Sequence, residues 1–124
     1  MTASNKEAAL EFLRLVAAGE IDRAYDTYVA TGMRHHNAYF PAGADALREA
    51  MTAAHVQQPG KIFEVKQAIA DSDRVAVHSH LRFKPADRGL AVVHIFRFEA
   101  GRIAEMWDLG MQVPSSSPNA DGLF

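Results

Sequence analysis

The sequence predicts an α+β domain in which a layer of helices packs on one face of an antiparallel sheet. A chain of 124 residues can bury one hydrophobic core and is too short to divide into two. Apolar residues recur at helical spacing through the first half of the chain and alternate with polar residues through the second half. Helices that precede a run of strands are typical of the α+β class. We therefore expect one domain over residues 1–124.

Three helices are expected in the first half of the chain. A capping box of Ser4 and Glu7 begins the first helix, and Gly19 ends it. The second helix is amphipathic and is expected to end near Gly32. Residues 33–43 contain two histidines, an asparagine and a proline, so they are expected to be irregular or a short strand. The expected helices cover residues 4–19, 21–32 and 44–56.

The second half of the chain has the period-two pattern of strands. Short polar or glycine-containing segments separate four apolar runs and are typical of turns. The expected strands cover residues 62–70, 74–83, 90–98 and 103–113. Residues 114–124 contain two prolines and several small polar residues, which predicts a C-terminal arm on the surface.

The turn between the last two strands decides which side chains share a face. A two-residue loop at Ala100 and Gly101 would need positive φ at both positions, and alanine is a poor residue for the first. A three-residue loop over residues 99–101, with Gly101 in the left-handed region, suits the sequence better. The expected register then pairs Phe98 with Arg102.

In that register His94 and Asp108 lie on one face of the sheet. His94 is expected opposite Met106 and diagonal to Asp108, at about 7 to 8 Å. The same face carries Val92, Phe96, Phe98 and Ala104, so the two polar residues stand in an apolar concavity. The opposite face carries Val93, Ile95, Arg97, Ile103, Glu105 and Trp107. It is too apolar for open solvent, which predicts a homodimer through this outer sheet face.

The composition limits the possible partners. A formal net charge of −2, with scattered lysines and arginines, gives no basic surface for nucleic acid. There is no cysteine, which excludes thiol nucleophiles and disulfides. The first residues have neither a basic leader nor an uninterrupted apolar run, so we expect no signal peptide, no membrane span and a cytoplasmic location. The expected partner is a small-molecule substrate.

Four stretches of the chain resemble a known family. They are HNAYFPAG (36–43), DSDRVAVHSHLRF (71–83), DRGLAVVHIFRF (87–98) and HIFRFEAGRIAEMWD (94–108). Together they resemble the SnoaL-like polyketide cyclases, in the wider ketosteroid isomerase and nuclear-transport-factor-two-like fold, and are similar to the bacterial predicted aldol-condensation branch. The resemblance implies a cone-shaped curved antiparallel sheet with three N-terminal helices enclosing a pocket. It also implies aldol-type ring closure by acid/base chemistry, without a metal or an organic cofactor.

The resemblance also implies roles for individual residues. Asp108, in the Trp-Asp pair, corresponds to the general base, and His94 corresponds to a histidine that assists it. His36 and Asn37 correspond to a pair at the pocket mouth. Together with the apolar face of the hairpin, these give a candidate site. The residues expected to bind the substrate are His36, Asn37, Phe96, Met106 and Val92. Two departures from the family pattern are Met106, where relatives often carry a histidine, and His94, where this branch often carries an aspartate.

This pair suits proton removal next to a carbonyl group. Burial among apolar side chains disfavours the ionised form of a carboxyl group, which would move the pKa of Asp108 toward neutrality. His94 could then polarise the carbonyl or hold the enolate oxygen. A dehydratase or double-bond isomerase would need the same two groups. The same residues also fit a non-catalytic binder of an apolar metabolite, or a purely structural role in which Asp108 caps a strand end and His94 is a core histidine.

The other histidines and aromatic residues are expected to have structural roles. His78 and His80 could bind a metal together with His36 or His94, but no acidic ligand follows at a suitable spacing, so no metal site is expected. The alternative expectation is that His78 and His80 face the dimer contact. His35 and His55 are expected on the surface, and Trp107 is expected to point away from the pocket. Four aromatic residues could line the cavity, but their spacing is more typical of core residues and no catalytic role is expected for them: Tyr25, Tyr28, Tyr39 and Phe40.

Overall fold

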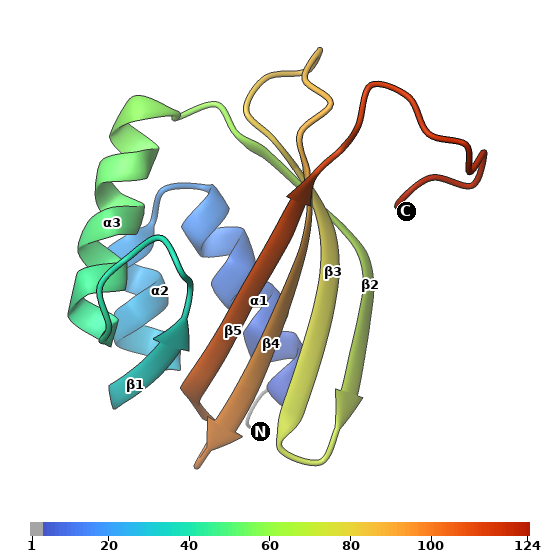
Figure 1. The fold of residues 1–124 in the computed structure, drawn as a ribbon. Coiled ribbons are helices and arrows are strands. Elements are labelled where there is room, and N and C mark those ends of the chain that lie inside the picture. The colour runs from blue at the N-terminus through green and yellow to red at the C-terminus, as the bar shows by residue number, and fades with distance from the viewer. Residues whose placement is uncertain (1–3) are drawn as a thin grey trace.

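A computed structural model describes residues 4–124 of the chain and confirms the α+β class. The helices lie on one side of a five-stranded sheet, whose order is β1-β5-β4-β3-β2 (Figure 1). The elements are α1 (Asn5–Ala17), α2 (Ile21–Tyr28), β1 (Val29–His36), α3 (Ala44–Gln57), β2 (Ile62–Asp71), β3 (Arg74–Arg82), β4 (Leu90–Glu99) and β5 (Arg102–Gln112). Apart from the second helix, which is shorter than expected, the bounds agree with the sequence prediction to within about one or two residues, the usual uncertainty of element ends.

The core lies between the helices and the inner face of the sheet. The side chain of Ser4 accepts a hydrogen bond from the N–H of Glu7 at 3.1 Å, so the expected cap of α1 is present. From α1, the Phe12 ring packs against Tyr25 of α2 at 5.5 Å and against Phe96 of β4 at 5.8 Å. Phe12 therefore joins two helices and the sheet in one core.

Strand β1 is the main difference from the sequence prediction. The second helix ends at Tyr28, because Val29 already has extended backbone angles and Gly32 has a φ of 79°, which no helix allows. The chain then forms β1, which runs parallel to β5 and places His36 beside Trp107. The sheet is therefore mixed: its four later strands are antiparallel as expected, and its first strand is parallel.

The expected loop between β4 and β5 is wrong, but the shared face is right. Glu99 pairs with Arg102, which leaves the two-residue loop that the sequence disfavoured, and Ala100 and Gly101 have φ of 50° and 78°. That loop alone would put His94 and Asp108 on opposite faces. The register shifts once between Arg97 and Phe98, and this shift restores the parity.

The register shift is a β-bulge at Ala104. Phe98 pairs with Ile103 and Arg97 pairs with Glu105, so Ala104 has no partner across the ladder. Ile103 consequently turns into the core, where it is fully buried, and not onto the outer face as expected. Beyond the bulge, His94 lies directly opposite Asp108, and Phe96 takes the place opposite Met106 that His94 was expected to fill.

The last residues fold back over the outer face of the sheet, the face that the helices leave uncovered. The N–H of Val113 donates to the carbonyl of Gly89 at 3.0 Å, and the chain then swings away from the body before it returns (Figure 1). The ring of Phe124 stacks on His80 at 4.3 Å and on His78 at 5.5 Å. The helices of the described part, residues 4–124, are all too short or too polar to cross a membrane.

Candidate active site

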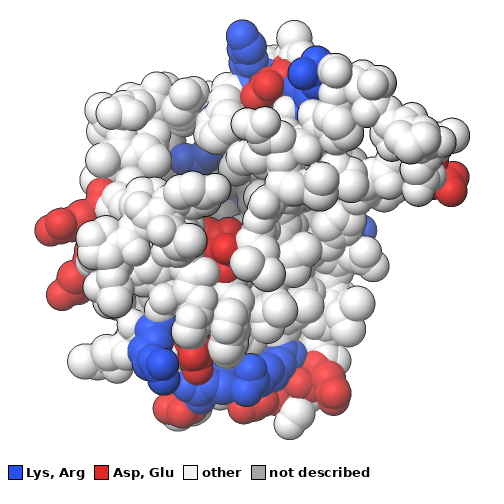
Figure 2. All heavy atoms as spheres, in the orientation of Figure 1, with Lys and Arg blue, Asp and Glu red and all other residues white. Residues whose placement is uncertain are grey.

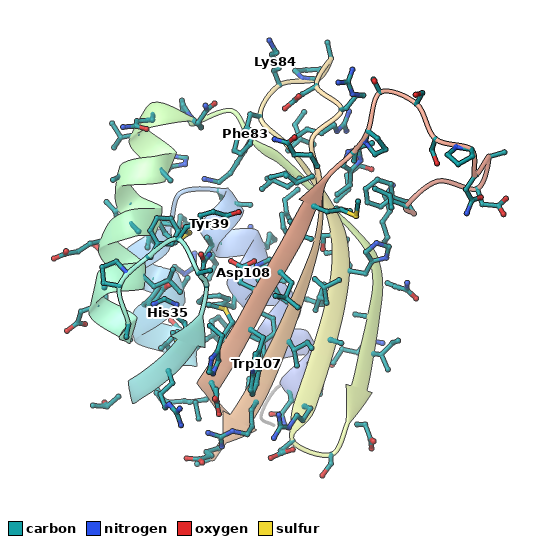
Figure 3. All side chains as sticks on the ribbon, in the orientation of Figure 1. His35, Tyr39, Phe83, Lys84, Trp107 and Asp108 are labelled. Carbon is teal, nitrogen blue, oxygen red and sulfur yellow. The ribbon has the colours of Figure 1, made fainter. Side chains whose placement is uncertain are left out.

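Asp108 and His94 form a polar pair on the inner face of the sheet. They are direct neighbours across β4 and β5, and the His94 Nε2 atom lies 3.4 Å from the Asp108 Oδ1 atom. The side chains are 13% and 24% exposed, so both are mostly shielded and still reachable from one side. Figure 2 shows an acidic group recessed in a hollow between β5 and the loop that follows β1, at the place where Figure 3 labels Asp108. The sequence prediction that the two residues share a hollow agrees with this geometry.

Asn37 holds the second oxygen of the carboxylate. Its Nδ2 group donates to the Asp108 Oδ2 atom at 2.8 Å. A hydrogen bond to an ionised acceptor is stronger than one between neutral groups, so this contact fixes the orientation of the carboxylate. The Oδ1 atom is left with His94 at 3.4 Å, which is longer than an ordinary N–H···O hydrogen bond. Oδ1 therefore keeps a lone pair for a proton.

The loop after β1 is braced so that Asn37 can make this contact. The backbone N–H of Asn37 donates to His35 Nδ1 at 3.2 Å, and the N–H of Tyr39 donates to the side-chain oxygen of Asn37 at 3.0 Å. His35 Nε2–H donates to the carbonyl of Pro41 at 2.7 Å, so the two ring nitrogens of His35 tie Asn37 to the end of the same loop. His35 is 8% exposed and inside the structure, so its expected place on the surface is wrong.

The environment of His94 favours a neutral imidazole. Its ring is stacked on Phe96 at 5.9 Å and lies 6.1 Å from the ring of Phe63. Burial lowers the pKa of His94, and the negative charge of Asp108 raises it by a smaller amount. Nδ1 is buried, and within residues 4–124 it has no hydrogen-bond partner. Because Nε2 faces the carboxylate, the single proton belongs on Nε2, where it can be donated.

His36 does not belong to this site, contrary to the sequence prediction. Its ring stacks on Trp107 with the centroids 5.0 Å apart, and its Nε2 atom lies 2.6 Å from the Glu105 Oε2 atom. Those two partners occupy the outer face, because residues alternate along β5 and Asp108 points inward. Trp107 lies on the outer face as expected, with the Arg74 guanidinium 5.3 Å from its ring centroid.

The three apolar residues expected in the site form its buried floor. Phe96, Met106 and Val92 are 0%, 4% and 6% exposed, and their partners across the ladder place them on the same face as His94. Met106 offers a thioether and no titratable group on this face. These apolar side chains shield the polar pair from water on the inner face.

Sequence reasoning gave no role to Tyr25 or Phe63, which both border the site. Tyr25 comes from α2 and is 4% exposed. Burial raises the pKa of its hydroxyl well above the usual value, the Arg48 guanidinium lowers it, and the charge of Asp108 raises it further. Tyr25 therefore stays protonated and responds to the charge of Asp108. The sequence named Tyr25 among the aromatic residues that could line the cavity, but the spacing of both residues is typical of the core and did not single them out.

The histidines of β3 lie apart from the pair. His78 and His80 face the C-terminal arm on the outer face, whereas His94 faces inward. Within residues 4–124 there is no group of three or more His, Asp or Glu side chains arranged to hold a metal ion. His55 covers Gly19 at the end of α1, and its ring occupies the space that a Cβ atom there would need. His78, His80 and His55 therefore do not contribute to the site.

The fold and the recessed pair define a class of protein. A curved sheet backed by three helices is also the fold of SnoaL-like and nuclear-transport-factor-two-like proteins of known structure. Residues 9–106 match the sequence profile described as the SnoaL-like domain, and the chain belongs to that family. No curated protein matches the sequence significantly.

Solved structures show the same fold at low sequence identity. An uncharacterised cystatin-fold protein from Novosphingobium aromaticivorans is 21% identical, with a TM-score of 0.74 over 86% of this chain and 98% of that chain. A SnoaL-like polyketide cyclase from Agrobacterium tumefaciens is 18% identical, with a TM-score of 0.72 over 90% and 94% of the two chains. A nuclear-transport-factor-two-like protein of unknown function from Cytophaga hutchinsonii is 11% identical, with a TM-score of 0.71 over 90% and 93%. At these identities the likeness is one of fold.

Proposed function

We propose that the protein is a cofactor-independent acid/base catalyst that acts on a small carbonyl compound, by aldol-type cyclisation or by isomerisation. The observation that carries this proposal is the pairing of an oriented carboxylate with a neutral imidazole at 3.4 Å in one hollow. Proton removal next to a carbonyl group needs a base and a hydrogen-bond donor within reach of the same small molecule. The SnoaL-like relative named as a polyketide cyclase fits this chemistry.

In the proposed reaction each group has one role. Asp108 Oδ1 takes the proton from the carbon next to the carbonyl, because Asn37 already occupies Oδ2. His94 Nε2–H donates to the carbonyl oxygen, which becomes an enolate as the proton leaves. The enolate then attacks a second carbonyl group of the same molecule, and the alkoxide that forms takes the proton back from the carboxylic acid of Asp108; from a β,γ-unsaturated ketone, the dienolate instead takes that proton at its γ-carbon. The first outcome is a ring closure and the second is an isomerisation.

The proposal is tested by hydrogen exchange into simple ketones. The purified protein is incubated with a ketone panel in D₂O, and loss of the α-proton signals is followed by NMR. We expect faster exchange with the unaltered protein and loss of at least about 100-fold in the Asp108→Asn variant, the usual scale of one positioned base. Asp121→Asn, in the exposed C-terminal arm, is the matched control and should exchange as the unaltered protein does. Equal rates in all three proteins would reject the role of Asp108.

A non-catalytic binder is the second candidate, because the Asn37 contact is equally compatible with it. A donor on the carboxylate orients a group that only needs to hold a ligand, as well as one that reacts. A passive binder would hold a ligand in the hollow and would not accelerate hydrogen exchange into the ketone. A dehydratase of the same fold remains an enzymatic alternative that uses the same pair. Dehydration is distinguished by release of water from a β-hydroxy ketone, which the same NMR experiment records.

We also propose that the protein forms a homodimer through the outer sheet face. Trp107 lies half-buried on this face beside His36 and Arg74, and Leu109 and Met111 are 60% and 55% exposed. Tryptophan and arginine are enriched at the centres of protein interfaces. A second copy would cover these side chains without closing the hollow of Asp108, which opens on the inner face.

A further inference from the structure

A groove runs between α1 and the beginning of β2, away from the hollow of Asp108. Its volume is about 550 Å³, within the range of small-molecule sites. The floor is apolar and includes Leu10, Phe63 and Val65. Val65 is 43% exposed although it lies on the inner, core-facing side of β2. The groove is thus a strip of inner face that the helices leave open.

Two cations border the groove, and only one of them is already paired. Arg14 contacts the Glu11 carboxylate at 2.5 Å, so its charge is balanced. Lys61 stands at the start of β2 and lines the same groove. Burial lowers the pKa of Lys61, and among residues 4–124 no carboxylate offsets that effect. An ammonium group that has lost part of its water and gained no anion in return is complementary to a negatively charged ligand.

We propose that this groove binds an amphipathic carboxylate, with its carboxylate group on Lys61 and its apolar chain on Leu10, Phe63 and Val65. The apolar floor alone would accept any apolar molecule. The unbalanced ammonium group of Lys61 favours a carboxylate ligand over its neutral analogue. This site does not depend on the proposed reaction, because none of its residues is a proton donor or acceptor in that reaction. It is separated from the catalytic pair by one side chain, Phe63.

Phe63 connects the groove to the hollow. Its ring lines the groove on one side, and on the other side its centroid lies 6.1 Å from that of His94. A chain that packs on Phe63 therefore changes the surroundings of the His94 imidazole without touching Asp108. Ligand binding in the groove should be visible in the NMR signals of the His94 ring.

The test compares octanoate with 1-octanol, which has the same chain length and no charge. Each ligand is titrated into the ¹⁵N-labelled protein, and the amide and histidine ring signals are followed. We expect shifts at Leu10, Phe63, Val65 and the His94 ring, and octanoate binding about fivefold or more tightly than octanol, the scale of one partly shielded charge-assisted contact. Lys61→Met should bring the two affinities together. Lys84→Met removes a lysine from the β3–β4 loop and should preserve the difference.

Three outcomes would overturn the proposal. Equal affinities of octanoate and octanol for the unaltered protein would mean that Lys61 only balances the C-terminal end of α1. A preference for octanoate that survives in Lys61→Met would place the carboxylate elsewhere. Loss of octanoate binding in a folded Asp108→Asn variant would assign the ligand to the catalytic hollow. Retained binding in that variant, whatever its exchange activity, would support a groove that is independent of the proposed reaction.

Discussion

Replacing His94 with glutamine should weaken the dependence of protein stability on pH in the mildly acidic range. The imidazole is 13% exposed, and burial lowers its pKa from the usual 6.5. The unfolded chain then binds a proton more readily than the folded protein does. Stability contributed by the neutral His94 is fully present above about pH 6.5 and is lost as the pH falls toward the folded pKa. Glutamine keeps a polar side chain at this position and removes the titration.

The size of the effect follows from proton linkage. One proton bound on unfolding lowers the free energy of unfolding by up to about 1.4 kcal/mol per pH unit. The attraction of Asp108 for the protonated imidazole opposes the burial effect and makes the slope smaller. Between about pH 6.5 and 5.5, His94 should therefore account for a loss of up to about 1 kcal/mol, because the unfolded imidazole is already half protonated at pH 6.5; this is a measurable part of a typical total of about 5–15 kcal/mol.

Urea denaturation at several pH values measures this slope. The free energy of unfolding of the unaltered protein and of His94→Gln is compared at about pH 7.5, 6.5 and 5.5, with the slope m checked for constancy. His78→Gln controls for the loss of an imidazole from the same sheet. Identical pH profiles of the unaltered protein and His94→Gln would refute the reasoning. A protein that becomes more stable than His94→Gln on acidification would show that attraction to Asp108 exceeds the cost of burial.

Three further changes should have measurable effects. Ala100→Gly should raise the free energy of unfolding by about 1 kcal/mol, because alanine at φ 50° is strained, whereas Ala53→Gly on the exposed side of α3 should lower it by about as much; urea denaturation compares the two. Asn37→Ala should lower stability by about 1–2 kcal/mol at neutral pH and slow ketone exchange, because the Asp108 carboxylate loses its donor, and unchanged exchange would limit the amide to a structural role. Trp107→Glu should convert the proposed dimer to a monomer in sedimentation analysis, and a dimer that persists would place the interface elsewhere.

The hairpin of β4 and β5 shows how far sequence reasoning reached in this fold. Period-two alternation located both strands, and it identified the face that carries His94 and Phe96. Alanine is unfavourable at positive φ, as the sequence prediction assumed. The chain nevertheless adopts this strained conformation at Ala100. The compensating bulge at Ala104 has no sequence signature, since alanine fits any position of a strand. The shared face was confirmed, whereas the proposed register was wrong.

The region of β1 could not be predicted, for a related reason. Its parallel pairing with β5 joins segments about 70 residues apart in the chain, and no local pattern encodes such a contact. That pairing decides that His36 stands beside Trp107 on the outer face. One residue later the chain leaves the strand, and the turn at Asn37 directs its amide to Asp108. Of the expected His-Asn pair, Asn37 therefore reaches the site and His36 does not.

A double-substitution cycle on ketone exchange tests most directly whether Asp108 and His94 act together on one molecule. The rate constants of the unaltered protein, Asp108→Asn, His94→Gln and the double variant are measured under one condition, after each variant is shown to be folded. If the base and the donor serve the same proton transfer, the double variant should exchange no more slowly than Asp108→Asn alone. Losses that simply multiply would mean that the two side chains contribute independently, and rates that do not change in any variant would mean that the hollow performs no proton chemistry.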